Sequence, residues 1–453
     1  MHYLGSIMRA CSPLIAALAM VGFAVATANA QAQTYYVRST GNDANSGLSP
    51  ALALRTIQAA VGKCTATGGG KTIYVGPGTY NERIRITNFV SPMPASGAST
   101  LPNSIIGDTA GAFTNEAGGP VIISGGNSLP YGIEINARHY WKIDGLTFTG
   151  QTAAGVYVTG STGIGIRNCM IRLATSTMGI YSDGWNCTIE DNTIQLGAPT
   201  GSGIFQRCMN PGSYSISRNR IYARGVDYLA SNFRTSTTPS TCYGIYFNVE
   251  SDSIIVKATI ENNVVTDRYT GCYVNATTLL PLTVISVSSN TIVGCTYPFD
   301  VQVDGTSLAT AQNNLVAKCY YGGRIGMPLG TLNGMLICGT VVGLNASVLV
   351  QTGVITAADP MFVNPSQGNF ALAPGSPAID RGVALGAPTL DVRNRPRPAD
   401  GDGDAVALPD LGAYEYQAEG RFRIVSWFQK DQRAVPRYKL PDVAPVKLGD
   451  VIN

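Results

Sequence analysis

The sequence predicts an all-β protein that folds as a single right-handed parallel β-helix, a solenoid with an N-terminal helical cap. Three observations favour this fold: an Asn-containing unit that returns mostly every 24 to 27 residues, a Gly-apolar unit before the copies, and short apolar runs that alternate with period two. Three short strands per repeat would stack coil upon coil at the strand spacing of about 4.8 Å. The 453 residues suggest several domains, but a solenoid grows in one dimension and needs only one.

A ladder of asparagines defines the repeat. The unit Ile-x-x-Asn-x-Ile, or a close variant, gives steps of 24, 27, 44, 27 and 24 residues between Asn168, Asn192, Asn219, Asn263, Asn290 and Asn314. The step of 44 holds one period and an insertion over Ala223–Cys242, and Gly145 takes the Asn position one period upstream. The Gly-apolar units begin at Gly132, Gly155, Gly179, Gly203, Gly244 and Gly271. Stacked amides would hydrogen-bond along the axis, which gives these Asn residues a structural role.

The N-terminus is expected to be a secretory signal peptide. Residues 1–30 combine Arg9, the apolar run PLIAALAMVGFAVA and a small-residue ANA ending, whereas a membrane anchor would need a longer run. The mature chain would be secreted, to a periplasm, a cell surface or the medium. It would carry 30 Lys and Arg (31 less Arg9), 28 Asp and Glu, and nine cysteines (ten less Cys11), so at least one cysteine is unpaired. This small net charge argues against nucleic acid as a partner.

Both ends of an open coil expose a sheet edge and an apolar core, so both need covers. Leu54–Cys64 is expected to form a short amphipathic helix that caps the first coil, and Asp359–Gly382 is expected to close the far end. The tail is not part of the repeat, and its partner is left open. The expected divisions after the signal peptide are the cap with the first coils, the regular coils, the C-terminal coils with their closure, and the tail, over 31–130, 131–342, 343–416 and 417–453.

Two pairs of stretches resemble a known family. YYVRSTGNDANSGLSPALALRTIQAAV with KTIYVGPGTY is similar to the opening of exported pectate-lyase-like β-helix proteins, and DPMFVNPSQGNFALAPGSPAID with PDLGAYEY to their closing signature. The resemblance covers Tyr35–Tyr416 and implies the fold. The family includes polysaccharide lyases, epimerases, hydrolases and members with no known reaction. The sequence lacks the Trp-x-Asp-His of pectin lyases, the Gly-His-Gly of hydrolases and the Asp-Pro-His of alginate epimerases, so the resemblance names no substrate.

The Gly-apolar strands predict two outward rows of side chains, because the residue after each Gly should point inward and the next outward. The first row is Glu134, Tyr157, Tyr181, Phe205, Tyr246, Tyr273 and Asp300, and the second is Asn136, Thr159, Asp183, Arg207, Asn248, Asn275 and Gln302. Aromatic rings beside amides suit a polysaccharide. The candidate substrate-binding residues are therefore Tyr157, Tyr181, Phe205, Tyr246, Tyr273, Asn248 and Asn275. The alternative is an aromatic ladder that only stabilises its own coils.

Glu134, Asp183 and Arg207 are the candidate catalytic residues, because they lie on one face in nearby coils. A lyase must neutralise a uronate carboxylate and remove the adjacent C5 proton; Arg207 or a neighbouring Tyr would act as base, while the two acids hold a cation or tune the base. The leading hypothesis is β-elimination of an acidic polysaccharide. One alternative is a non-catalytic glycan-binding or structural surface protein, which the missing motifs favour, and another is a glycoside hydrolase with two carboxylates about 5–10 Å apart. Plain ion pairs between Asp183 and Arg207, and between Asp300 and Arg324, would serve structure alone.

The stretch ADGDGDAVALPD places Asp400, Asp402 and Asp404 at alternate positions with Gly between them. This spacing is typical of Ca²⁺ loops, so these residues are the candidate metal ligands and Ca²⁺ is the candidate cofactor, in a structural role. A solvated acidic turn is the alternative. Cys295 and Cys319 each follow a ladder Asn by five residues and should stack in adjacent coils, as a disulfide or as buried thiols.

Overall fold

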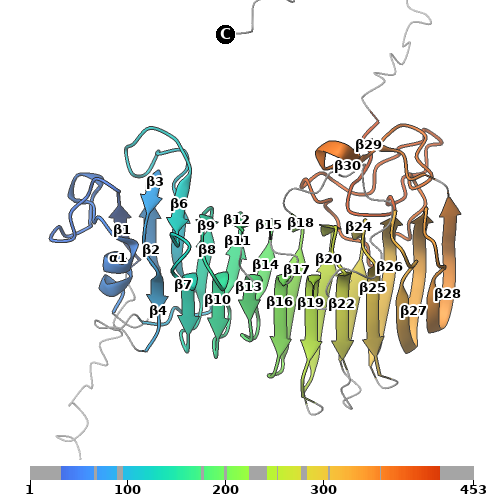
Figure 1. The fold of residues 1–453 in the computed structure, drawn as a ribbon, viewed down its shortest axis with the longest axis horizontal. Coiled ribbons are helices and arrows are strands. Elements are labelled where there is room, and N and C mark those ends of the chain that lie inside the picture. The colour runs from blue at the N-terminus through green and yellow to red at the C-terminus, as the bar shows by residue number, and fades with distance from the viewer. Residues whose placement is uncertain are drawn as a thin grey trace, which may run out of the picture. The chain divides into compact units, whose positions relative to one another are not determined.

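The computed structural model describes residues 32–65, 69–88, 95–174, 178–197, 201–223, 242–251, 254–276, 283–304, 307–357 and 359–418. The expected signal peptide, most of the insertion and nearly all of the tail lie outside these residues. Within them, 28 strands pair in parallel, and each strand pairs with strands of neighbouring coils (Figure 1). The pairings form three ladders, called sheets A, B and C, which confirm the predicted parallel β-helix. Among the described residues, no helix is long and apolar enough to cross a membrane.

The three sheets run along the coil axis, one strand per coil in each. Sheet A contains β4 (Ile84–Ile86), β7 (Tyr131–Asn136), β10 (Ala154–Thr159), β13 (Met178–Ser182), β16 (Ser202–Cys208), β19 (Tyr243–Val249), β22 (Thr270–Ala276) and β25 (Tyr297–Val303). Sheet B contains β1 (Gln33–Val37), β2 (Lys71–Val75), β5 (Asn103–Gly107), β8 (Trp141–Asp144), β11 (Gly165–Arg167), β14 (Thr188–Glu190), β17 (Gly212–Ser217), β20 (Val256–Glu261) and β23 (Val284–Ser288). Sheet C contains β3 (Gly78–Tyr80), β6 (Val121–Ser124), β9 (Thr147–Thr149), β12 (Met170–Leu173), β15 (Thr193–Leu196), β18 (Arg220–Ala223), β21 (Val264–Thr266) and β24 (Thr291–Val293).

The last coils consist of longer strands that bend from one sheet into the next. They are β26 (Leu308–Ala317), β27 (Arg324–Cys338) and β28 (Asn345–Ala357). Coils therefore continue past Val342, where the sequence pattern fades. A short antiparallel pair follows, β29 (Phe362–Asn364) and β30 (Asn369–Leu372), and two 3-10 turns lie at Pro50–Leu52 and Pro365–Gln367.

The inward side chains form one continuous apolar core along the axis. The Gly residues that open the strands of sheet A are required by this packing. A Cβ at Gly244 would lie 2.2 Å from Val265 Cγ1 of sheet C and 2.5 Å from the carbonyl oxygen of Gly271 in the next coil. Any side chain there would displace the core or the neighbouring coil.

The Asn ladder is present from Asn192 to Asn314 and is buried. Asn263 shows the pattern: its Oδ1 accepts from the backbone N–H and the Nδ2 of Asn219 at 3.0 Å each, and its Nδ2 donates to the carbonyl oxygen of Ile216 at 2.8 Å. These bonds satisfy the backbone groups of a buried turn.

Asn168 and Gly145 were expected in the ladder but lie one residue away from it. Strand pairing sets Ile166 opposite Ile189, which places Cys169 opposite Asn192. Asn168 is exposed at φ 52° and Gly145 lies at φ 70°. Both occupy the left-handed position that precedes the ladder residue, where Gly and Asn are favoured.

The N-terminal cap is the helix α1 (Ile57–Lys63), whose buried side chains are Ile57, Ala60 and Val61. Thr56 caps it by accepting from the N–H of Ala59 at 3.1 Å. The Glu82 carboxylate accepts from the N–H groups of Ile57 and Gln58 at 2.8 and 2.9 Å. An anion is favourable there because the first N–H groups of a helix have no partner within it.

The C-terminal segment does not close the far end, contrary to the expectation for Asp359–Gly382. It packs along the side of the coils instead, and Figure 1 shows β29 and β30 over the coils rather than beyond β28. The cause is that sheet C carries apolar side chains on its outer surface in these coils. They form a second core of Val264, Val293, Leu315 and Leu336 with Phe370, Leu372, Ile379, Leu411 and Tyr414.

The cysteines form no disulfide among the described residues, where all nine are buried free thiols. Cys295 and Cys319 stack in adjacent coils as predicted, with the N–H of Cys295 3.4 Å from Cys319 Sγ. Of the two alternatives left open for this pair, the structure shows buried thiols.

Candidate functional site

The first outward row of sheet A is in the predicted register. Each residue from Glu134 to Asp300 lies opposite its counterpart in the next coil. The aromatic rings stack nearly parallel, with centroid distances of 4.8, 5.5, 4.2 and 4.9 Å along the series Tyr157, Tyr181, Phe205, Tyr246 and Tyr273. Tyr131 extends the row, 4.3 Å from Tyr157. These six residues are called the aromatic row.

The rings of the aromatic row cover one another's faces. A sugar ring therefore meets ring edges and hydroxyl groups along the row. At the first end of the row the Arg83 guanidinium lies over the Tyr131 ring, 5.0 Å from its centroid. Burial raises the pKa of Tyr157 and of Tyr246 to about 12, so both hydroxyls stay protonated and can donate hydrogen bonds. The structure thus contains the ring stacking that stabilises the coils. The outer surface of the aromatic row consists of aromatic ring edges and hydroxyl groups.

The polar row beside it contains an ion pair between Arg207 and Glu250. Arg207 Nε lies 2.9 Å from Glu250 Oε1, and Arg207 Nη2 contacts Oε2 as well. Arg207 Nη1 also donates to the Tyr181 hydroxyl at 3.2 Å, and Asn248 Nδ2 donates to Glu250 at 3.0 Å. The hydrogen bonds from Arg207 lower the pKa of Glu250, and Glu250 raises the pKa of Arg207.

Asp183 lies beside this ion pair without forming the predicted one. It accepts a hydrogen bond from the N–H of Gly160 at 2.8 Å, and the ion-pair partner of Arg207 is Glu250. Burial raises the pKa of Asp183, while the Gly160 N–H and the nearby Arg207 oppose that rise. The structure therefore brings Asp183, Arg207, Glu250 and Tyr181 together, and these four residues are called the Arg207 cluster.

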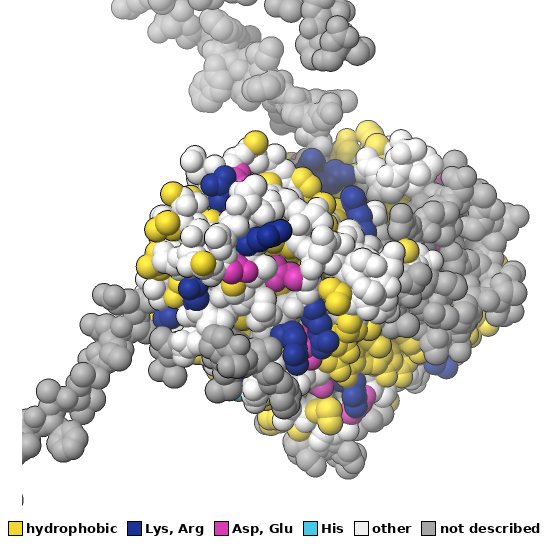
Figure 2. Space-filling model, turned by 60° about the vertical axis from the view of Figure 1, so that its left-hand side comes forward, with side chains coloured by type: hydrophobic (Ala, Val, Ile, Leu, Met, Phe, Trp, Pro, Cys, Tyr) yellow, Lys and Arg dark blue, Asp and Glu magenta, His cyan; other side chains and the backbone are white. Residues whose placement is uncertain are grey.

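Glu134 lies apart from the Arg207 cluster. It forms ion pairs with Arg83 at 2.6 Å and Arg85 at 3.3 Å. Strand register places Glu134 opposite Tyr157, which lies opposite Tyr181, so Glu134 is two coils, about 10 Å, from the position of Tyr181 along the axis. Figure 2 shows acidic and basic side chains next to one another on the face in view, beside a continuous hydrophobic surface.

The second of the two predicted ion pairs has formed. Asp300 and Arg324 face each other in register, with Arg324 Nε 2.8 Å from Asp300 Oδ1. Gln302 donates to the same Asp300 oxygen at 3.2 Å. Asn275 donates to Asn248 at 2.8 Å, so the two amides proposed for substrate binding bond to each other along the polar row.

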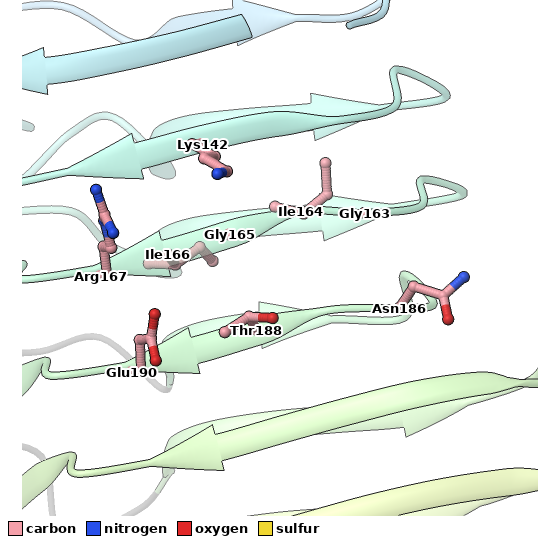
Figure 3. Close-up of a pocket in the computed structure, with 9 residues that line it drawn as sticks. All are labelled: Lys142, Gly163, Ile164, Gly165, Ile166, Arg167, Asn186, Thr188 and Glu190. Carbon is pink, nitrogen blue, oxygen red and sulfur yellow. The ribbon is translucent and has the colours of Figure 1, made fainter. Parts of the chain in front are cut away.

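Sheet B carries a cavity of about 180 Å³ on its outer surface. Gly165 lies between Lys142 and Thr188 in the strand register, so the missing side chain leaves the hollow (Figure 3). Arg167 and Glu190 line one end of it. Arg167 is paired with Asp144 at 2.8 Å, and the cavity is lined by charged groups of both signs, including Lys142 and Glu190.

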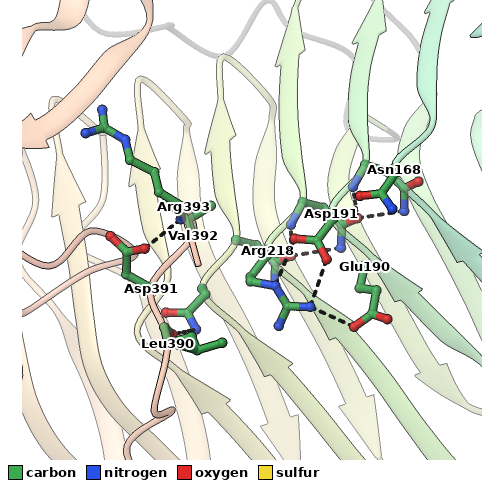
Figure 4. A network of polar contacts seen from close by, with 12 residues as sticks. Asn168, Glu190, Asp191, Arg218, Leu390, Asp391, Val392 and Arg393 are labelled. Atoms are coloured by element: carbon green, nitrogen blue, oxygen red, sulfur yellow. Dashed lines mark hydrogen bonds and ion pairs between the residues drawn. The ribbon is translucent and has the colours of Figure 1, made fainter. Parts of the chain in front are cut away.

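Where sheet B turns into sheet C, a charged network serves structure. Arg218 bonds Asp191 at 2.8 Å and Glu190 at 2.7 Å in the preceding coil (Figure 4). Figure 4 also shows residues 390–393 of the C-terminal segment over the neighbouring strands. The contacts of Arg218 tie coils together, and hydrogen bonds from Arg220 and Asn262 to the carbonyl oxygens of Val392 and Leu390 attach the C-terminal segment.

The predicted metal ligands are only partly gathered. Asp400 and Asp402 lie with Asp380, and their carboxylate oxygens come within 4.8 Å of one another; Asp380 replaces the predicted Asp404. Asp404 accepts from the N–H of Val406 at 2.8 Å. Asp380 is buried and already accepts from three backbone N–H groups, those of Gly401, Asp402 and Leu408. The three clustered carboxylates are hard oxygen donors of the kind that Ca²⁺ prefers.

Sequence reasoning missed Glu250, Tyr131 and Asp380. Glu250 follows Asn248 by two residues, as the next position of the same alternation, and this is the signal that could have found it. Tyr131 precedes its Gly by one residue and reaches the row because its neighbour in the next coil is the small Ala154. Asp380 lies 20 residues before Asp400, and no local pattern connects the two.

Comparison with known proteins agrees with this fold. The family model described as "Right handed beta helix region" matches residues 131–316, and no curated protein matches the chain in sequence. Among solved structures, pectate lyase Pel9A is 16% identical, with 85% of this chain and 96% of that chain covered and a TM-score of 0.50. An alginate lyase from Paenibacillus sp. str. FPU-7 is 15% identical, covering 72% and 99%, with a TM-score of 0.44. At such identities the likeness concerns the fold, and the chain has the fold of the pectate-lyase-like right-handed β-helix proteins.

Proposed function

We propose that the protein is exported and binds an extended acidic polysaccharide along the outer surface of sheet A. The observation that carries this proposal is the aromatic row from Tyr131 to Tyr273, which runs along the axis beside a row of amides, acids and Arg207. A linear polymer matches a recognition surface that repeats once per coil. The fold shared with a pectate lyase supports a uronate polymer as the ligand class.

Cleavage by β-elimination is proposed at the Arg207 cluster. A uronate carboxylate competes with Glu250 for the guanidinium, since both are carboxylates that an arginine binds in a bidentate manner. Glu250 raises the pKa of Arg207, which makes Arg207 the group that neutralises the carboxylate and a poor base. Tyr181, 3.2 Å from Arg207, then takes the C5 proton in its ionised form. The C5 electron pair forms the C4–C5 double bond, the C4–O bond breaks, and the leaving oxygen takes a proton back from the Tyr181 hydroxyl, which restores the ionised form.

Non-catalytic glycan binding is the second candidate, and one observation favours it. Arg207 and Glu250 are already paired with each other, and the rings of the aromatic row are already stacked. Such a surface binds a glycan at its rim without any group left free for chemistry. A glycoside hydrolase has less support, because Glu134 is paired with two arginines about 10 Å along the axis from the strand that carries Tyr181.

Turnover separates these candidates. Residues 31–453 are incubated with pectate, alginate, hyaluronan and neutral glycans, while ultraviolet absorbance follows unsaturated uronates and a second assay follows new reducing ends. A lyase gives both signals and loses them in Arg207→Ala and Tyr181→Phe. Arg324→Ala, which breaks the ion pair with Asp300 in the same sheet, is the matched control and keeps activity. Reducing ends without absorbance indicate a hydrolase, and binding without either signal indicates the non-catalytic protein.

A structural Ca²⁺ ion at Asp380, Asp400 and Asp402 is proposed as the cofactor. The support is the chemistry of three converging carboxylates. Bound Ca²⁺ stabilises the folded state by mass action, so the unfolding midpoint should rise with Ca²⁺ and fall with a chelator. Asp402→Asn should remove this response, whereas Asp404→Asn should keep it. If the unfolding midpoint of the unmodified chain does not change with Ca²⁺, the proposal is wrong.

A further inference from the structure

The far end of the β-helix has an unusual composition. From Ile325 to residue 358 the sequence contains no Asp, Glu, Lys or Arg. Earlier coils carry ion pairs on their surfaces, such as Arg207 with Glu250. Arg324, the first residue of β27, is the last charge before this stretch and is paired with Asp300 of the preceding coil. The rest of the last two coils is therefore the uncharged end of an otherwise charged solenoid.

This end presents an open strand edge. Within the part of the chain that the structure describes, β28 pairs with β27 alone, and Figure 1 shows it as the last strand. No residue of β28 is fully buried. Leu349 is 64% exposed and Val350 is 43% exposed, and Val341 in the preceding turn is 54% exposed. This surface is called the β28 end.

Soluble β proteins protect such edges with charges, prolines, bulges or a covering element. The opposite end of this β-helix follows that rule, since α1 packs against the first strands. The β28 end has no charge and no proline, and no described element covers its edge. A long, uncharged, partly apolar edge is a template for pairing with another strand.

The edge of β28 is symmetric in length about its central residue, Gln351. The stretches in sheets A and C are Asn345–Val348 and Val354–Ala357, four residues each, and Val350–Thr352 lies in sheet B between them. The corners at Leu349 and Gly353 are equally far from Gln351. A two-fold axis through Gln351 would therefore pair the sheet A stretch of one copy with the sheet C stretch of another, in antiparallel orientation.

The same axis places inward-pointing side chains of one copy opposite inward-pointing side chains of the other. Val348 and Val354 extend the buried columns of Met327 and Met335, and the axis sets them opposite each other. Gln351 extends the column of Leu332 and would meet its own copy, where two amides can satisfy each other reciprocally. Inward residues thus face inward residues throughout, so one continuous core would run through both molecules.

We propose that two copies of this chain associate end to end through the β28 end, about a two-fold axis through Gln351. The absence of charge removes the like-charge repulsion that a self-complementary interface would otherwise suffer. The surface offers the 13 residues of β28 and those of the turn before it, slightly fewer than the roughly 20–30 residues per side of a standard interface. The dimer is therefore expected to dissociate on dilution.

Sedimentation of residues 31–453 over a range of concentrations tests the association. The unmodified chain should show a monomer–dimer equilibrium. Val350→Lys places like charges near the axis and should weaken the dimer by ~10-fold or more. Leu308→Lys, at a 55% exposed position in β26, two coils before the open edge, is the matched control and should leave the dimer unchanged. Circular dichroism checks that both variants keep the fold. A chain that stays monomeric at all concentrations, or equal effects of the two lysines, overturns the proposal.

A crosslink tests the symmetry. Gln351→Cys should give a covalent dimer under mild oxidation, because the two-fold axis brings residue 351 against its own copy. Asn345→Cys, six residues from the axis, should not crosslink to itself. Crosslinking at 345 and not at 351 would refute this axis. Deleting residues 419–453 is the last control, and it should leave the dimer unchanged. If the deletion abolishes the dimer, or if a dimer appears only after the deletion, the β28 end does not pair with a second β28 end in the way proposed.

Discussion

The ion pair between Arg207 and Glu250 makes a direct prediction about affinity. The hydrogen bonds from Arg207 lower the pKa of Glu250, so Glu250 remains ionised at neutral pH and competes with an acidic ligand. Glu250→Gln weakens that competition. We expect binding of the acidic polysaccharide to tighten by about tenfold, which corresponds to about 1.4 kcal/mol.

Isothermal titration measures this change. Glu190→Gln, which weakens an ion pair with Arg218 on another sheet, should leave the affinity unchanged. A loss of binding in a folded Glu250→Gln protein would instead assign Glu250 to the ligand contact.

The buried amide ladder makes a prediction about stability. Asn263→Ala removes the acceptor for the backbone N–H of Asn219 and the donor to the carbonyl oxygen of Ile216. Each buried group left without a partner costs about 1–3 kcal/mol, so the free energy of unfolding should fall by ~3 kcal/mol. Asn275→Ala removes an amide contact on the outer surface and should cost under about 1 kcal/mol. Chemical denaturation of both variants checks the difference, and equal losses would contradict a special role for the ladder.

At the scale of single residues, sequence reasoning succeeded where the repeat sets the position. The outward row from Tyr157 to Tyr273 followed from counting after each Gly. Sequence reasoning failed at Asn168, which fits the ladder unit in residue type but lies one residue out of register with the ladder. The partner of Arg207 was missed because the insertion interrupts the chain between the two coils, and a long side chain pairs with whichever carboxylate its geometry reaches.

Among the structural elements, the Gly residues that open the strands of sheet A allow a paired test. Gly244→Ala would push a Cβ to 2.2 Å from Val265 Cγ1 and 2.5 Å from a neighbouring carbonyl oxygen. Overpacking of this kind costs about 1–3 kcal/mol. Gly165→Ala on sheet B meets only the Lys142 side chain at 3.4 Å and should change stability by under about 0.5 kcal/mol. Thermal unfolding of both variants distinguishes a packing requirement from a general loss of chain flexibility.

Strands and caps were predictable to different degrees. Short apolar runs with period two identify the strands because both faces of each strand have fixed environments in every coil. The C-terminal segment was misplaced because Val264 and Leu315 point outward from sheet C and still look like core residues in the sequence. Their outward direction attracts the C-terminal segment to the side of the coils, and no local pattern encodes that direction.

Across the whole β-helix, the attachment of the C-terminal segment depends on buried charge. Arg397 and Glu415 form an ion pair at 2.8 Å with no exposed side-chain surface, and Asp410 lies in the same group. Burial and the nearby Glu415 raise the pKa of Asp410 from 3.8 to about 8. Between these two values the folded protein holds a proton that the unfolded chain releases. This carboxyl therefore makes the free energy of unfolding fall as the pH rises from about 4 to about 8.

Chemical denaturation at pH 5 and pH 8.5 measures that fall. Asp410→Asn should make the decrease smaller, because the amide does not titrate. Asp359→Asn, at an exposed position, should leave it as in the unmodified chain. An unchanged pH dependence in Asp410→Asn would show that this carboxyl is already ionised in the folded protein at pH 5.

The pairing of each strand with the next coil also dictates an order of events in folding. The ladder bonds of adjacent coils join residues mostly 24 to 27 positions apart, so a growing coil finds its partner soon after that partner has formed. Bonds from the C-terminal segment reach back 122 to 172 positions, to Thr291, Asn262 and Arg220. Loop closure over such distances is slow, so coils should assemble progressively while the C-terminal segment attaches last. During synthesis, a chain that still lacks about its last 60 residues can thus already contain most of its coils. The outer apolar surface of sheet C would then stay exposed until the C-terminal segment is made and packs against it.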